Sequence, residues 1–286
     1  MSQFMDFSTP PEILRSNLSS FLLTLKALGV QNILSFDLMN RPSIPTLCHG
    51  LETLYALGAI DDETNLTKLG DRMAEFPASP HESKMMLESL QLGCSKEIIY
   101  VGAALQVKSL FYQPKNPRQR IEYDKAMNEI IDRTGDHVTY VNLMEVNDCM
   151  PYSENECRER FLNFQALQLI DDVRTQLTSH LRRYGRIQGI DTDISIAERS
   201  ALIRRCITAG FFTNVAKLGN DGMYRSLRGK VQVSISVTSI LHRFGNPSEY
   251  ILFGDTYDGS RGGIEVRHCS AIEAKWLREV APNYWG

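Results

Sequence analysis

Asp136 and His137 are adjacent residues of two types that often perform general acid–base catalysis. Neighbouring side chains on a helix point in different directions, and no third group in the sequence is placed to orient this pair. We therefore expect Asp136 to be a helix N-cap and His137 to be either packed or turned toward a nucleic acid. No serine or cysteine stands in a nucleophile elbow. The sequence predicts no catalytic residue and no catalysis by this chain alone.

ATP chemistry would require a glycine-rich loop ending in Lys-Ser or Lys-Thr, and an acidic pair for a metal ion. The chain contains no GxxxxGKS or GxxxxGKT string, and no DEAH or other DExH string. Its glycine-dense stretches, Gly185–Gly189 and Gly259–Gly263, also lack the required lysine pair. We expect no cofactor site within this chain.

The cysteines show no CxxC pair and no histidine at metal-ligand spacing; they are Cys48, Cys94, Cys149, Cys157, Cys206 and Cys269. Such a pattern indicates reduced thiols in an intracellular protein, with no metal site. No apolar run approaches the ~20 residues of a membrane-spanning helix. The N-terminus lacks the basic region and apolar core of a secretory signal. We expect no membrane partner.

The segment from Gln113 to Arg120 could bind a single nucleic-acid strand, because it combines rigid prolines with three cations. Its candidate RNA-binding residues are Gln113, Pro114, Lys115, Arg118 and Arg120. The alternative interpretation is an exposed, solvated loop.

Four further candidates alternate on short strands around a hairpin: Lys217, Tyr224, Arg225 and Arg228. Oligonucleotides bind this region of OB-fold barrels. The alternative is a charged outer face that serves solubility.

Charge is unevenly distributed although the net charge of the 286-residue chain is only −3. Residues 121–159 contain ten Asp or Glu against three Lys or Arg, a difference of −7. Residues 173–243 contain twelve Lys or Arg against four Asp or Glu, a difference of +8. The pattern predicts a basic face, and the alternative is two solvated surfaces.

The elements that would position these residues begin with a helix–turn–helix at residues 51–77. Gly58 is expected to end the first helix in a left-handed conformation, Thr67 to cap the second, and Pro77 to follow its end. The segment Lys96–Val107 is apolar nearly all round, which predicts a central buried helix. Cys157–Gln168 and Asp171–Tyr184 are expected as two further helices.

After a helix at Ile196–Gly210, the hydrophobic period changes from about 3.6 to 2 residues. The strand candidates are Phe211–Lys217, Met223–Leu227, Val231–Ile235 and Tyr250–Gly254, separated by turn residues. Several short strands at this spacing predict a small barrel. The fold class is therefore α+β and mostly helical.

The chain resembles the C-terminal region of the DEAH-box RNA helicases, from about Pro11 to Trp285. The resemblance rests on LETLYALGAIDDETNLTKLGDRMAEFP, on GDHVT followed by an apolar helix, on RFLNFQAL, and on RCITAGFFTNVAK with WLREVAPNYW at the end. It implies a degenerate winged-helix domain at residues 1–76, a ratchet-like helical bundle at 77–190 and an OB-fold-like domain at 191–286. We expect the chain to be a fragment of a longer helicase.

The resemblance also implies a function: an accessory region of an ATP-dependent RNA helicase that lines the RNA channel, in nuclear pre-mRNA splicing. ATP and Mg would belong to the full-length enzyme. The implied partners are single-stranded RNA, bound weakly by this chain alone, the ATPase domains of the same protein, and a G-patch activator or spliceosomal factors. His137 and Thr139 would be further RNA-side residues.

The alternative function is a protein-interaction scaffold without RNA contact, in which a G-patch activator docks near Leu51, Leu54 and Leu57.

Overall fold

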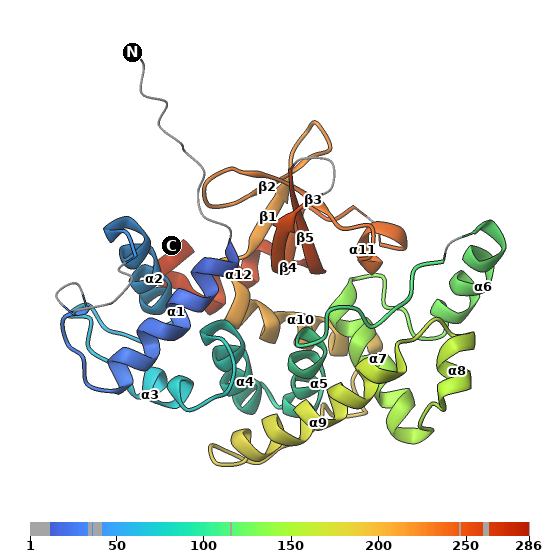
Figure 1. Cartoon of the computed structure of the whole chain (residues 1–286), viewed down its shortest axis with the longest axis horizontal. Helices are drawn as coiled ribbons and strands as arrows, with labels where there is room; N and C mark the ends of the chain where they lie inside the picture. The colour runs from blue at the N-terminus through green and yellow to red at the C-terminus, as the bar shows by residue number, and fades with distance from the viewer. Residues whose placement is uncertain are drawn as a thin grey trace.

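The computed structural model describes residues 12–33, 36, 42–114, 116–245, 247–259 and 263–285. Helices form the lower part of the molecule and a small barrel stands above them (Figure 1). This arrangement confirms the mostly helical α+β fold class. Within the described residues, no helix is both long and apolar enough to cross a bilayer.

The N-terminal part of the described chain contains α1 (Glu12–Ala27), α2 (Ile44–Ala56) and α3 (Lys68–Ala74). Gly58 follows the end of α2 with φ +74°, where a residue without Cβ is favoured, as predicted. Thr67 caps α3, because its Oγ1 accepts a hydrogen bond from the backbone N–H of Gly70 at 3.0 Å. Both local predictions for this segment are confirmed.

The helical bundle contains α4 (Pro80–Leu92), α5 (Ser95–Leu105), α6 (Pro117–Met127), α7 (Asp136–Cys149), α8 (Glu154–Glu159) and α9 (Phe164–Leu181). Helix α5 is buried nearly all round, which confirms that it is central. The predicted break between helices near residue 170 is wrong. Helix α9 runs through it because no Gly or Pro interrupts residues 164–181. The break falls instead at Phe161, whose φ is +58°.

The barrel is preceded by α10 (Ile196–Phe211) and followed by α12 (Ala274–Val280) and α13 (Pro282–Trp285). Its strands are β1 (Val215–Leu218), β2 (Tyr224–Ser226), β3 (Gln232–Ile235), β4 (Tyr250–Asp258) and β5 (Ile264–Ile272), with α11 (Ile240–Arg243) after β3. In the described chain they close in the order β1-β2-β3-β5-β4, and the β3–β5 pair is parallel. The strand expected to start at Phe211 begins only at Val215, because Phe211 ends α10 and residues 212–214 form a turn. The prediction did not include β5.

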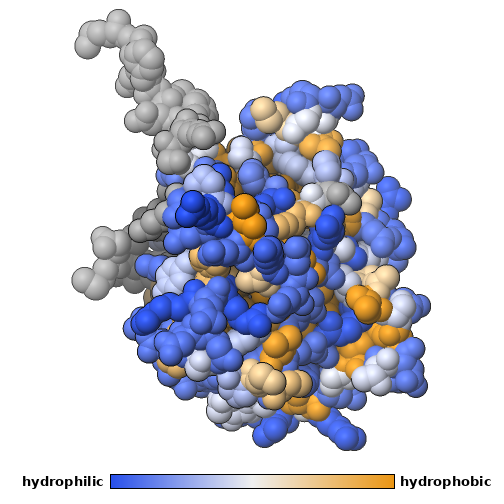
Figure 2. Space-filling view, turned by 90° about the vertical axis from the view of Figure 1, so that its right-hand side faces the viewer, coloured by the Kyte–Doolittle hydropathy of each residue, from blue (hydrophilic) through white to orange (hydrophobic). Residues whose placement is uncertain are grey.

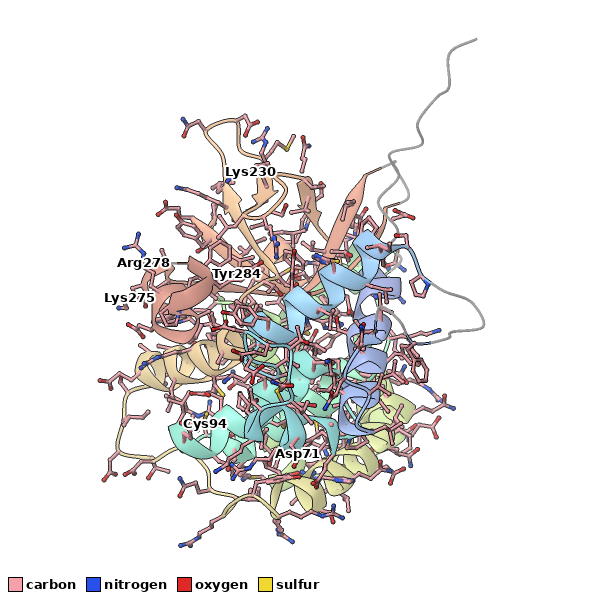
Figure 3. The ribbon with its side chains drawn as sticks, turned by 90° about the vertical axis from the view of Figure 1, so that its left-hand side faces the viewer. Asp71, Cys94, Lys230, Lys275, Arg278 and Tyr284 are labelled. Atoms are coloured by element: carbon pink, nitrogen blue, oxygen red, sulfur yellow. The ribbon has the colours of Figure 1, made fainter. Side chains whose placement is uncertain are left out.

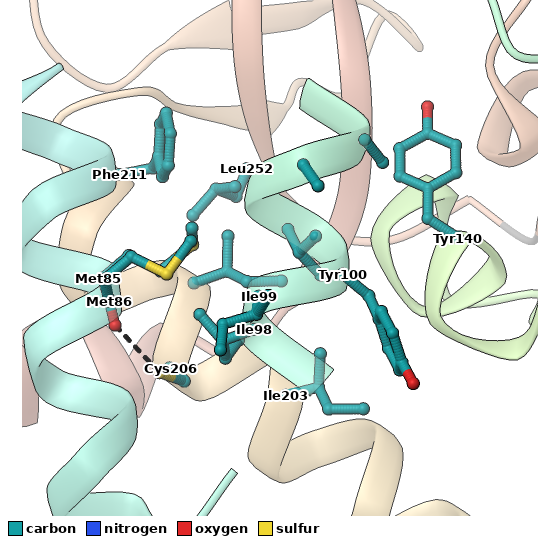
Figure 4. Close-up of a cluster of buried hydrophobic side chains, with 14 of the residues drawn as sticks. Met85, Met86, Ile98, Ile99, Tyr100, Tyr140, Ile203, Cys206, Phe211 and Leu252 are labelled. Atoms are coloured by element: carbon teal, nitrogen blue, oxygen red, sulfur yellow. Dashed lines mark hydrogen bonds between the residues drawn. The ribbon is translucent and has the colours of Figure 1, made fainter. Parts of the chain in front are cut away.

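One hydrophobic core runs from the winged helix through the bundle to the base of the barrel, and a smaller core fills the barrel. Figure 4 shows α4 and α10 meeting around Met85, Ile203 and Cys206, where the Cys206 thiol donates to the Met85 carbonyl. Helix α10 thus packs into the bundle while also contacting β4 and β5. The barrel and bundle are therefore held together by a shared helix.

Candidate nucleic-acid interface

The loop before α6 is presented by the bundle as an exposed segment. The backbone N–H of Tyr112 donates to the carbonyl of Phe161 at 2.7 Å, which fixes where the loop leaves the bundle. Tyr112 itself remains 53% exposed. Gln113 is also exposed and Pro114 half-buried, whereas Lys115 lies outside the described residues. Tyr112 was missed by the sequence reasoning, although an aromatic directly before a Gln-Pro loop is a candidate stacking surface.

Helix α6 begins with two arginines in its first turn. Asn116 caps the helix by accepting a hydrogen bond from the Gln119 N–H at 2.9 Å, and Pro117 occupies the first helical position. Arg118 and Arg120 are exposed, and no acidic residue lies in this turn. Because helix N-termini already carry partial positive charge, the two arginines concentrate positive potential there. The side of the molecule that carries α6 and α8 is mainly hydrophilic, with hydrophobic residues in small separate groups (Figure 2).

Helix α6 is anchored to the barrel. Arg243 of α11 pairs with Asp124 at 2.8 Å, and its guanidinium carbon lies 4.9 Å from the centre of the Tyr123 ring. The Tyr123 ring also packs edge-on against Phe161 at 5.6 Å. The start of α6 is thus positioned by both the bundle and the barrel.

The cations predicted on the barrel strands already have partners within the chain. Lys217 pairs with Glu249 at 3.2 Å, and two hydrogen bonds join Arg225 to the Asp221 carboxylate at 2.9 and 2.5 Å. Hydrogen bonding from Arg225 lowers the pKa of Asp221 well below its ordinary value. The Tyr224 hydroxyl donates to the carbonyl of Ser248 at 2.7 Å. A phosphate would have to compete with these contacts.

Arg228 connects the barrel to two other elements. Its guanidinium donates to Glu52 of α2 at 2.8 Å and to the Tyr284 hydroxyl of α13 at 2.9 Å. Figure 3 shows Tyr284 on the side of the molecule that also carries Lys230, Lys275 and Arg278. The main contacts of Arg228 are therefore within the chain, where it joins the barrel to α2 and α13, although its side chain remains half-exposed.

His137 and Thr139 are fully buried, which corrects the expectation that they face RNA. His137 Nδ1 lies 2.8 Å from Ser270 Oγ of β5, and the Thr139 hydroxyl donates to the Gly135 carbonyl at 2.9 Å. Burial, with a smaller contribution from His268, lowers the pKa of His137 to about 3. His137 is therefore neutral at pH 7 and has no access to phosphate.

Asp136 is not the N-cap of its own helix; Gly135 is. The Asp136 carboxylate instead accepts hydrogen bonds from the backbone N–H groups of Ile240 and Cys269, both at 2.6 Å, and from Ser239 Oγ at 2.8 Å. It therefore satisfies backbone donors of α11 and β5. Burial raises the pKa of Asp136 to about 6 despite these bonds.

The basic block of the sequence pairs with its acidic block. Besides Arg243–Asp124, Arg199 pairs with Glu145 at 2.6 Å and Arg174 with Asp148 at 2.5 Å. Part of the predicted basic face is thus neutralised inside the molecule.

The winged helix carries a surface cavity of about 340 Å³ beside α2. Leu54 and Leu57 are buried in the core, so they cannot form a docking surface, whereas Leu51 is half-buried and lines the cavity. Tyr55 adds an apolar wall, and its hydroxyl donates to Asp62 at 2.6 Å. The rim is acidic, formed by Glu52, Asp61 and Asp62.

Three family models match consecutive parts of the chain. They describe a helicase-associated winged-helix domain at residues 50–78, a helicase-associated ratchet-like domain at 79–140 and an oligonucleotide/oligosaccharide-binding fold at 203–284. This order of domains, together with the bundle and closed barrel, defines the accessory region of a helicase.

Two curated relatives match almost the whole chain. The "Probable ATP-dependent RNA helicase DHX35" of Homo sapiens is 34% identical over 97% of this chain, and the "Pre-mRNA-splicing factor ATP-dependent RNA helicase prp22" of Schizosaccharomyces pombe is 35% identical over 96%. The chain corresponds to the winged-helix, ratchet-like and OB-fold region of DEAH-box RNA helicases. It spans 38% of the human protein and 23% of the fission yeast protein.

Proposed function

We propose that this chain lines the RNA channel of a DEAH-box helicase and that its principal RNA contact is formed by the exposed residues Tyr112, Gln113, Arg118 and Arg120. The carrying observation is the contrast between two sets of cations. In the described part of the chain, Arg118 and Arg120 have no ion pair, whereas Lys217, Arg225 and Arg228 each pair with a carboxylate. Unpaired cations at a helix N-terminus bind phosphate without displacing another anion.

The residues present do not fit an ATP–Mg site. The sequence has no phosphate-binding loop, and the described residues contain no group of three His, Cys, Asp or Glu side chains that could hold a metal ion. We propose that ATP and Mg are bound by ATPase domains of the same protein. The purified chain should therefore show no RNA-stimulated ATP hydrolysis.

The proposed setting is pre-mRNA splicing in the nucleus. Its support is the splicing-factor name of the fission yeast relative. Depletion of the full-length protein, followed by measurement of unspliced transcripts, tests this setting; unchanged splicing would argue against it.

The RNA contact is tested by a salt titration of fluorescent oligouridylate with the wild type, an Arg118→Ala/Arg120→Ala variant and a Lys217→Ala/Arg228→Ala variant. Each lost phosphate contact lowers the log–log salt slope by ~0.7 for a single strand. The Arg118/Arg120 variant should lose affinity and slope for all RNA sequences alike, because phosphates carry no base information. The barrel variant should change less. An unaltered slope in the Arg118/Arg120 variant would refute the channel contact.

A second proposed role is regulator docking at the cavity beside α2. An apolar floor with an acidic rim suits a peptide that inserts an apolar side chain between basic residues. A G-patch activator is the partner class suggested by the family. Leu51→Arg should abolish binding of a labelled G-patch peptide and leave RNA affinity unchanged; retained peptide binding would exclude this surface.

A further inference from the structure

A second and larger cavity, of about 510 Å³, lies on the bundle between α5 and α9. Helix α9 runs along the lower edge of the molecule, on the opposite side of the bundle from the barrel (Figure 1). The cavity is lined by two isoleucines, three hydroxyl residues, Tyr100 and charged residues; the charged ones are Lys96, Asp148, Arg174 and Arg182. Neither the RNA contact nor the docking surface beside α2 uses these residues.

One wall of this cavity is fixed by the segment that follows α9. Ser95 Oγ donates to the Gln188 carbonyl at 3.0 Å and accepts from the Gln188 N–H at 2.9 Å. The Lys96 N–H donates to the same carbonyl at 3.0 Å. These bonds hold Ile187, which lines the cavity, against the start of α5. The cavity is thus bounded by anchored backbone.

The floor is a fixed polar group. Tyr100 is only 1% exposed, and its hydroxyl donates to Asp148, which also pairs with Arg174 at 2.5 Å. Arg174 makes a second pair with Asp171 at 3.2 Å. Its guanidinium carbon lies 5.5 Å from the centre of the Tyr100 ring. Figure 4 shows Tyr100 on the other side of α5 from Met85 and Cys206. Tyr100 is part of the core and also lines this cavity.

The remaining charge is positive. Arg174 is neutralised by its two carboxylates, whereas Lys96 and Arg182 are exposed and have no ion pair in the part of the chain that the structure describes. Lys96 Nζ lies 5.7 Å from the Tyr100 ring centre, which leaves the ammonium group at the cavity rim. Ile187 is half-buried and supplies apolar surface in the same cavity, whereas Ile99 is only 2% exposed.

We propose that this cavity binds an acidic peptide segment of a partner protein, with carboxylates on Lys96 and Arg182 and an apolar side chain against the half-buried Ile187. Charge complementarity selects this occupant. A nucleic-acid strand fits less well, because a phosphate backbone carries no apolar group to place against Ile187. The Tyr100 ring is also too buried to stack with a base.

The test uses the whole chain and three fluorescein-labelled probes: a short peptide of Asp, Leu and Gly, the same peptide with Asn in place of Asp, and oligouridylate RNA. Binding is followed by fluorescence anisotropy in low salt. The test variant is Lys96→Glu/Arg182→Glu. The matched control is Lys125→Glu/Arg158→Glu, which reverses two exposed cations on α6 and α8. Circular dichroism confirms that both variants fold.

We expect the acidic peptide to bind the wild type and the control, and the test variant to bind it at least ~10-fold more weakly. The Asn peptide should bind poorly to all three proteins. Four results would overturn the proposal: no binding of the acidic peptide at millimolar concentration, equal binding of the Asn peptide, no loss in the test variant, or a selective loss of RNA binding instead. The last result would assign the cavity to RNA.

Discussion

Arg228 Nη2 lies 2.8 Å from Glu52 Oε2, so the loop between β2 and β3 is tied to α2 of the winged helix. The two residues are separated by 176 positions in the sequence. The same guanidinium lies 5.4 Å from the Tyr284 ring centre. The Arg228 side chain therefore connects three elements: the β2–β3 loop, α2 and α13.

Removing this connection should loosen the barrel from the winged helix. Because Arg228 and Glu52 are about half-exposed, Arg228→Ala should lower the free energy of unfolding by only about 0.5–1 kcal/mol. Urea denaturation measures the change. Lys230→Ala, an exposed neighbour, is the control and should have no effect. The charge-swapped double variant Arg228→Glu/Glu52→Arg should recover part of the lost unfolding free energy. A double variant less stable than Arg228→Glu alone and Glu52→Arg alone would contradict the pairing.

The Asp136 carboxylate should be among the most sensitive positions for stability. Asp136→Ala leaves the buried N–H groups of Ile240 and Cys269 without acceptors, which should cost about 3 kcal/mol of unfolding free energy. Asp136→Asn retains one acceptor oxygen, so its free energy of unfolding should lie between those of the wild type and Asp136→Ala. Asp193→Ala, at an exposed position, is the control. Equal stability of the Ala and Asn variants would contradict this account.

Stability should decrease as the pH falls from 6.5 to about 4. Burial lowers the pKa of His137 to about 3 and that of His268 to about 4, so the unfolded chain binds two more protons than the folded one in this range. Asp136 acts in the opposite direction, because its pKa is raised to about 6. For these three groups, the net difference of about one proton below pH 6 contributes a slope of ~1.4 kcal/mol per pH unit, and Glu82, whose pKa is raised by burial, reduces this slope.

His268→Asn provides the check on that sign. This substitution removes one of the two histidines that bind an extra proton in the unfolded state. The remaining proton differences at His137 and Asp136 have opposite signs and should nearly cancel between pH 4 and 6. Thermal melting points measured across this range should become almost independent of pH. A slope equal to that of the wild type would exclude His268 as a contributor.

Two helix glycines should respond differently to alanine. A Cβ on Gly210 would lie 2.3 Å from the His81 carbonyl oxygen, which is fixed in the backbone, whereas a Cβ on Gly102 would meet the flexible end of Met86 at 2.0 Å. Helix propensity favours alanine at both sites by ~1 kcal/mol. Gly210→Ala should still destabilise the protein by ~2 kcal/mol, and Gly102→Ala should change stability by less than ~1 kcal/mol. Urea denaturation distinguishes the two outcomes.

Local signals predicted the elements whose stabilising contacts are close in sequence. Thr67 bonds to a residue three positions away, and Gly58 needs only its own backbone conformation. The buried face of α5 follows from its composition. The strand β5 was missed because it interrupts apolar residues with His268 and Ser270. Their polar groups meet Tyr140 and His137, 128 and 133 positions away.

In the candidate site, too, local features were predictable from the sequence and long-range contacts were not. Arg118 and Arg120 are exposed as expected, although they lie in the first turn of α6 and not in a loop. The partners of Lys217, Arg225 and Arg228 could not all be read from the sequence, since Glu52 comes from a different domain. His137 was ambiguous for the same reason: only the position of Ser270 decides that the ring is buried.

The carboxylate of Asp136 also sets an order of events during synthesis. Its hydrogen-bond donor in β5, the backbone N–H of Cys269, is made 133 residues later, which takes roughly 7–27 s at ~5–20 residues per second on the ribosome. Until then the start of α7 must stay hydrated, because a buried carboxylate without donors is costly. The bundle therefore waits for β5 of the barrel, and its final consolidation follows the synthesis of that strand.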